Sequence, residues 1–149
     1  MIKTIATNRK AYHDFILGET VEAGIELTGT EIKSIRAAAV NLRDSYVRPD
    51  DGELWLVGAH IARYDPGSYM SHEPTRRRKL LLHRKQINTL ISKSAEKGLT
   101  MVATKLYLKG HLAKVEVALA KGKKLYNKRE DIARRDTERE MERAIAYHK

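Results

Sequence analysis

The sequence predicts a mainly β protein, a small antiparallel β-barrel of the oligonucleotide-binding type with two to three flanking α-helices. Short apolar segments alternate with polar residues at a period of two, turn residues separate them, and only brief stretches carry helical periodicity. At 149 residues, the chain is long enough for one domain with a sizeable core. We expect this domain at residues 1–120 and a basic tail at 121–149, because the composition changes at Lys121.

The first half of the predicted domain opens with a short polar lead-in at residues 8–14. Apolar and polar residues then alternate over 21–28, as in a half-buried strand. Thr28 precedes Glu31 by three residues, the capping-box spacing that predicts a helix start. Two further strands are expected, and a turn between them. The strands cover 45–48 and 54–61, and the turn covers 49–52.

The second half begins with a loop at 65–74, rich in proline, glycine and serine. A short strand at 79–82 is expected to lead into a helix at 83–97, which Gly98 ends. Two more strands, joined through residues 109–111, predict a hairpin. They cover 101–108 and 113–119.

The charge of the chain indicates a polyanionic partner. A net charge of +10 and a pI near 9.8 favour nucleic acid over an anionic membrane surface. The sequence contains no cysteine, which excludes disulfides and thiolate chemistry. The N-terminus lacks the apolar run of a signal peptide, and no segment is apolar enough to cross a bilayer. We therefore expect a cytoplasmic protein with no membrane partner.

Enzyme signatures are missing from the sequence. The six histidines show no paired metal-ligand spacing, and neither a phosphate-binding loop nor a Gly-x-Ser-x-Gly nucleophile motif occurs. We expect no catalytic residue, no metal and no cofactor. The sequence predicts a binding protein.

The most cationic stretch is residues 74–85, where six of twelve residues are Arg or Lys and none is acidic. A Leu80–Leu82 triplet lies inside it, and we expect this triplet to enter a core and fix the neighbouring cations. Arg76, Arg78 and Lys79 are then candidate ligands for phosphate oxygens, which guanidinium groups bind bidentately. The alternative is a solvated basic loop that leads into an ordinary helix.

Glu22 is a candidate of a different kind. It projects from the predicted strand opposite Val21 and Ala23, beside Gly24. A carboxylate there can accept hydrogen bonds from a base edge or a ribose 2′-hydroxyl. The alternative is a cross-strand salt bridge.

Seven motifs, taken in order, resemble the SsrA-binding protein family, also called small protein B, whose members partner transfer-messenger RNA. The resemblance covers nearly the whole chain to about Arg139, and the combination of motifs is highly specific. The motifs are NRKA (8–11), EAGI (22–25), GTEIKSIR (29–36), NLRDSY (41–46), PTR (74–76), RKLLLH (78–83) and AKGKKLY (120–126).

The resemblance implies an adaptor and not an enzyme. Family members bind the tRNA-like domain of transfer-messenger RNA and bring it to the empty A site of a stalled ribosome. Elongation factor Tu and alanyl-tRNA synthetase are implied as indirect partners through the RNA, and the protein is expected to be a monomer. The runner-up is a generic single-strand-binding barrel.

The resemblance also implies site residues. The family's RNA-binding determinants fall on Asn8, Glu22 and Leu81, although the apolar run around Leu81 by itself predicts a core position. We add Arg9, Lys10 and Arg36, the cations of matching motifs, to the candidate RNA-binding residues.

The tail is expected to be disordered when free and to fold as a helix in the vacant messenger channel of the ribosome. Asn127 and Ala38 stand where the family usually has Asp and Gly, and the turn at 109–112 also departs from the family pattern. The candidate ribosome-binding residues are Gly122, Lys123, Lys124, Tyr126, Lys128, Arg129, Arg134, Arg135 and Arg139.

Overall fold

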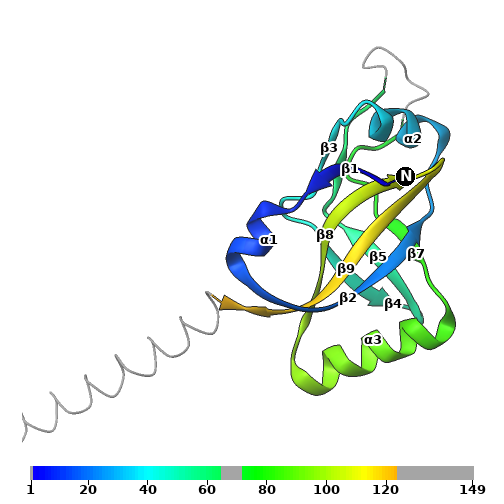
Figure 1. The fold of residues 1–149 in the computed structure, drawn as a ribbon. Coiled ribbons are helices and arrows are strands. Elements are labelled where there is room, and N and C mark those ends of the chain that lie inside the picture. Colours follow the sequence, from blue (N-terminus) through cyan, green and yellow to red (C-terminus); the bar gives the residue numbers. More distant parts are fainter. Residues whose placement is uncertain (1, 65–71, 124–149) are drawn as a thin grey trace, which may run out of the picture.

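The computed structural model describes residues 2–64 and 72–123 (Figure 1). Nine strands and three helices lie in these ranges. The strands are β1 (Ile2–Thr7), β2 (Phe15–Ile25), β3 (Val40–Asn41), β4 (Tyr46–Asp50), β5 (Glu53–Val57), β6 (His60–Ile61), β7 (Arg78–Leu81), β8 (Thr100–Lys109) and β9 (Leu112–Gly122). The helices are α1 (Arg9–Asp14), α2 (Gly29–Arg36) and α3 (Arg84–Lys97).

Seven strands form one antiparallel sheet in the order β1-β8-β4-β5-β7-β2-β9. Because β8 also pairs with β9, the sheet closes into a ring (Figure 1). Strand β1 pairs with residues 105–109 of β8, beyond the point where β4 pairs with β8 at Met101. The strands β3 and β6 make a separate two-stranded sheet. The prediction of a mainly β fold on a closed antiparallel sheet with flanking helices is confirmed.

The core lies inside this ring. Its fully buried side chains come from elements far apart in the chain, including Ile35 of α2, Leu56 of β5 and Leu106 of β8. The predicted alternation after Val21 is confirmed, because Ala23 and Ile25 are buried in this core. Period-two burial therefore decides which side chains of each strand face outward, where a ligand can reach them.

The N-terminal region differs from the prediction. Residues 8–14 are not a simple lead-in, because a strand precedes them and a helix occupies most of them. Most side chains of β1 are exposed, so this added strand lacks the apolar alternation that reveals a strand in sequence. Strand β2 also begins earlier than predicted, and its pairing with β9 shifts register between Leu17 and Thr20, which hides the periodicity there.

The β4–β5 hairpin is tighter than the predicted turn. Asp51 and Gly52 are its only two loop residues, and both have positive φ, 53° and 75°. This is the backbone of a type I′ turn, whose twist suits two-residue hairpins. Pro49 and Asp50 therefore belong to β4 and not to the turn.

The predicted strand at 54–61 is interrupted at Gly58. Its φ is +82°, and a Cβ there would lie 2.9 Å from the main-chain oxygen of Asp44. Only glycine fits this position without strain. The chain turns here, so that β5 joins the large sheet and β6 pairs with β3.

The predicted helix starts and stops are confirmed. Thr28 and Glu31 form the capping box of α2, and Gly98 is the left-handed residue after α3. The predicted hairpin of 101–108 and 113–119 is also confirmed, as the longer pair β8 and β9.

Candidate nucleic-acid interface

A row of residues crosses four strands on the outer face of the sheet. Leu81 of β7 lies opposite Gly24 of β2, Gly24 lies opposite Lys114 of β9, and Lys114 lies opposite Tyr107 of β8. Residues paired across neighbouring strands share one face of a pleated sheet. We call Glu22, Gly24, Leu81, Tyr107 and Lys114 the outer row.

Glu22 belongs to the outer row because it lies two residues before Gly24 on β2 and therefore on the same face. Its carboxylate accepts a hydrogen bond from the hydroxyl of Tyr107, and Nζ of Lys109 lies 3.5 Å from its other oxygen. The hydrogen bond from Tyr107 holds the pKa of Glu22 below its ordinary value, and the charges of Lys109 and Lys114 act in the same direction. Glu22 therefore stays ionised at neutral pH.

Glu22 keeps capacity for a further contact. The cross-strand ion pair expected as its alternative role is present, with Lys109, yet 38% of the Glu22 side chain remains exposed. An ionised carboxylate offers about four acceptor positions. The contact with Lys109 and the exposed acceptor surface thus coexist.

Part of the outer row lines an open depression of about 550 Å³ between β2, β7, β9 and the start of α3. Gly24 forms a tight point in it, since a Cβ there would lie 3.2 Å from Cβ of Leu81. The depression combines an apolar wall, a carboxylate and a cation. Its lining residues are Glu22, Gly24, Leu81, Leu82, His83, Gln86 and Lys114.

The core position predicted for Leu81 is wrong. Leu80 is fully buried and Leu82 packs partly against the core, but Leu81 is 49% exposed. The physical reason is the alternation of β7, which turns Leu80 inward and its neighbour outward. The structure thereby brings Leu81 to the same depression as Glu22.

The same alternation corrects the picture of Arg78 as an accessible phosphate ligand. Its side chain is fully buried and forms a 2.6 Å ion pair with the equally buried Glu31. Its other nitrogens donate to main-chain oxygens of Ala59, Pro74 and Glu73. Arg78 therefore ties α2 to β7, and its buried guanidinium group is out of reach of a ligand in this arrangement.

Glu31 anchors the basic stretch from inside. Burial alone would raise the pKa of Glu31, but hydrogen bonds from Arg76, the Thr28 amide and Arg78 outweigh it and lower the pKa to about 2. Arg76, whose side chain is 37% exposed, donates to Glu31 at 2.6 Å. Two of the six cations thus share one buried carboxylate.

Two further cations of the stretch are paired with acidic residues. Arg77 contacts Asp50 at 2.7 Å and lies over the ring of Trp55, 4.1 Å from its centroid. Arg84 pairs with Glu53 at 2.6 Å. Within the described part of the chain, Lys79 has no ion pair, and it is half-buried on the outward side of β7. Lys79 is thus the cation of this strand that remains available to a polyanion.

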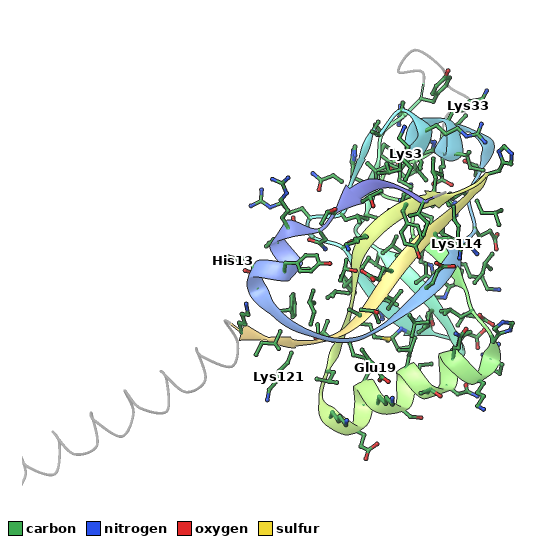
Figure 2. All side chains as sticks on the ribbon, in the orientation of Figure 1. Lys3, His13, Glu19, Lys33, Lys114 and Lys121 are labelled. Atoms are coloured by element: carbon green, nitrogen blue, oxygen red, sulfur yellow. The ribbon has the colours of Figure 1, made fainter. Side chains whose placement is uncertain are left out.

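The predicted residues Arg9 and Lys10 lie elsewhere, at a second depression of about 560 Å³ beside α1, and Asn8 is the residue that caps this helix. Its lining also includes His13, which lies in Figure 2 on the opposite side of the view from Lys114. The structure therefore separates the predicted site residues into two regions.

Asn8 itself is buried. Its amide nitrogen donates to the Ala103 oxygen at 2.9 Å, and its amide oxygen caps α1 through the Ala11 amide. Lys10 pairs with Asp44 at 2.6 Å, whereas Arg9 is exposed. Asn8 thus positions Arg9 and Lys10 by fixing the start of α1 on β8.

The remaining predicted residues are spread along the chain. Arg36 is exposed at the end of α2, and Gly122 pairs with Phe15 at the end of β9. Lys123 follows directly. The other predicted tail residues lie outside the described residues: Lys124, Tyr126, Lys128, Arg129, Arg134, Arg135 and Arg139.

Sequence reasoning missed Tyr107, Lys109 and Lys114 as members of this surface. A signal was present, since alternation in the predicted hairpin places Lys105, Tyr107 and Lys109 on one face. The missing information was the register that carries this face next to Glu22.

No helix within residues 2–64 and 72–123 has the length and apolarity to span a membrane. Across the same residues, no group of three or more His, Asp or Glu side chains is arranged to hold a metal ion.

Comparison with known proteins decides the family. The model of the SmpB protein family matches residues 5–147. This chain belongs to the SmpB family. An SsrA-binding protein of Dehalococcoides mccartyi is 58% identical over 144 residues, covering 97% of this chain and 84% of that relative. One from Carboxydothermus hydrogenoformans is 57% identical, covering 97% of both chains.

A solved structure supports the SmpB assignment at the level of the fold. It was described under the heading "tmRNA-SmpB: a journey to the center of the bacterial ribosome". The similarity has a TM-score of 0.68 at 48% sequence identity, and it covers 79% of this chain and 83% of that chain. The SmpB resemblance expected from the seven sequence motifs is confirmed.

Proposed function

We propose that this chain is the RNA-binding adaptor of trans-translation, which binds the tRNA-like domain of transfer-messenger RNA and delivers it to the empty A site of stalled ribosomes. The observation that carries the proposal is the family match over residues 5–147, with relatives named SsrA-binding protein. The adaptor works by binding alone, in the cytoplasm, as a monomer. Elongation factor Tu and alanyl-tRNA synthetase meet it only through the RNA.

The outer row supports an RNA ligand on physical grounds. Folded RNA presents ribose 2′-hydroxyls and unstacked bases as well as phosphates. Glu22 offers an acceptor to hydroxyl and amino donors, Leu81 offers an apolar surface for a base, and Lys114 offers a cation for phosphate. A surface for phosphates alone would have no use for an ionised carboxylate.

The tail belongs to the same proposal. The part of the tail that follows β9 enters the vacant messenger channel and folds there as a helix, signalling that no message is present. Residues 130–149 contain neither Pro nor Gly, and Arg135 and Arg139 are one helical turn apart in such a helix. Channel walls lined by RNA phosphates would stabilise this row of cations.

The test compares two RNAs at one salt concentration. A transcript of the tRNA-like domain should bind more tightly than poly(U) of equal length, because a generic single-strand binder tolerates any sequence and shape. Filter binding or fluorescence anisotropy measures both affinities. Equal affinities would support the generic single-strand-binding function instead.

A further inference from the structure

Two carboxylates face each other across β2 and β9. Glu22 and Glu116 are direct partners in the register of these strands. Like charges directly opposite each other on a sheet are destabilising, and each carboxylate tends to turn away from the other. Something must therefore hold each of them in place.

Each carboxylate is held by a hydroxyl of β8. Thr104 donates to Glu116 at 2.6 Å, and Tyr107 donates to Glu22. Burial and the bond to Glu22 raise the pKa of Tyr107, so its hydroxyl stays protonated and remains a donor at neutral pH. The two acids are thus drawn to different donors of the same strand.

We propose that Tyr107 is a positioning residue for RNA recognition, which holds the Glu22 carboxylate away from Glu116 and beside the outer-row depression. Resting on the proposed function, the inference adds that Tyr107 acts through Glu22 and not through RNA contacts of its own. Glu22 is a flexible, partly exposed side chain, and fixing it before binding removes an ordering cost from complex formation.

The first measurement needs no RNA. Glu22 is faced by Tyr107 and Lys109 of β8 and by Lys114 and Glu116 of β9, while His83 of the α3 N-terminus lines the same depression. The carboxyl ¹³C signal of Glu22 should titrate below the ordinary value of 4.5 in the unchanged protein. Tyr107→Phe should move that midpoint upward. An unmoved midpoint would overturn the proposal.

The second measurement is a double-mutant cycle with the tRNA-like transcript. Tyr107→Phe keeps the ring and removes one hydroxyl, and we expect it to weaken binding about fivefold, the scale of one hydrogen bond. Glu22→Gln should weaken binding by at least as much. On the Glu22→Gln background, Tyr107→Phe should cost nothing further, since it acts through the charge that is already gone.

Tyr46→Phe is the matched control. Tyr46 is a strand tyrosine, 40% exposed, that does not line the outer-row depression, and loss of its hydroxyl should leave the Glu22 titration unchanged. A full additional loss from Tyr107→Phe on the Glu22→Gln background would overturn the proposal, because Tyr107 would then contact RNA directly. If the unchanged protein fails to prefer the tRNA-like RNA, the proposed function fails, while the Glu22 titration still decides the role of Tyr107.

Discussion

At the scale of single residues, the pair of Glu31 and Arg78 is the most consequential in the structure. Both side chains are fully buried, and they join α2 to β7. Removing one partner of a buried ion pair costs far more than the pair itself contributes, because the other charge remains buried and unpaired. The orientation of the basic stretch depends on this contact.

Glu31→Gln is expected to lower the free energy of unfolding by about 3–5 kcal/mol, since it leaves Arg78 buried without its counter-charge. Chemical denaturation measures the change. Glu19→Gln is the control, because Glu19 forms an ion pair with Lys93 at the same 2.6 Å but is 62% exposed. The Glu19→Gln variant should lose much less stability than Glu31→Gln, because solvent screens an exposed ion pair. An equal loss of unfolding free energy in the two variants would contradict the view that burial makes the Glu31–Arg78 pair costly to break.

Glu31 also predicts a pH dependence of stability. Its pKa falls from 4.5 to about 2 on folding, which corresponds to about 3 kcal/mol. Because the folded pKa is the lower one, this stability is fully present above pH 4.5 and is lost as the pH falls toward 2. Denaturation between pH 2 and 6 should show the loss, and Glu31→Gln should flatten the curve over that window.

Lys79 and Arg78 should respond differently to alanine although they are adjacent. Lys79→Ala should leave stability nearly unchanged and weaken RNA binding. It should also reduce the slope of log affinity against log salt concentration by about 1, the value for one lost phosphate contact. Arg78→Ala should unfold or strongly destabilise the protein, because it removes the partner of Glu31. Denaturation and salt-titrated anisotropy separate the two effects. If the Arg78→Ala protein is stable and its RNA affinity depends less steeply on salt, Arg78 contacts phosphate after all.

At the scale of elements, the end of α2 carries a local strain. Ala38 has a φ of +59°, and the Ala38 and Ala39 amides donate to the oxygens of Ile35 and Ser34. This is a Schellman motif with alanine at the left-handed position where glycine is usual. The left-handed φ of Ala38 is the physical reason why glycine is the usual residue at this position of the family.

Ala38→Gly is expected to raise the free energy of unfolding by about 0.5–1 kcal/mol, because relief of the left-handed strain exceeds the added entropy of the unfolded chain. The neighbouring Ala37→Gly is the matched control. Ala37 has an ordinary φ of −83°, so glycine there should destabilise by a similar amount. Thermal or urea unfolding of both variants checks the opposite signs.

At the scale of the whole molecule, the closed sheet and the tail should be separable in function. Truncation after Arg129 should leave affinity for the tRNA-like transcript within a few-fold, because the outer row lies entirely within β2, β7, β8 and β9. The same truncation should abolish peptide tagging in a reconstituted translation reaction. A truncated protein that still supports tagging would contradict the proposed role of the tail.

The sequence by itself determined the features that depend on neighbours in the chain. The capping box at Thr28 and Glu31, the stop at Gly98, the β8–β9 hairpin and the mainly β composition all follow from spacings of a few residues. The exposure of Leu81 could also have been predicted, since side chains alternate along β7 and Leu81 faces outward once Leu80 is placed in the core.

Only the tertiary structure decided which charges meet. Glu31 and Arg78 are 47 residues apart in the chain, and Tyr107 and Glu22 are 85 apart. No local pattern carries the strand register that makes them neighbours. The basic stretch therefore looks uniformly available in sequence, whereas in the fold buried and surface carboxylates engage Arg76, Arg77, Arg78 and Arg84. The pairing of β2 with β7 on one side and with β9 on the other likewise sets Glu22, Leu81 and Lys114 around one depression.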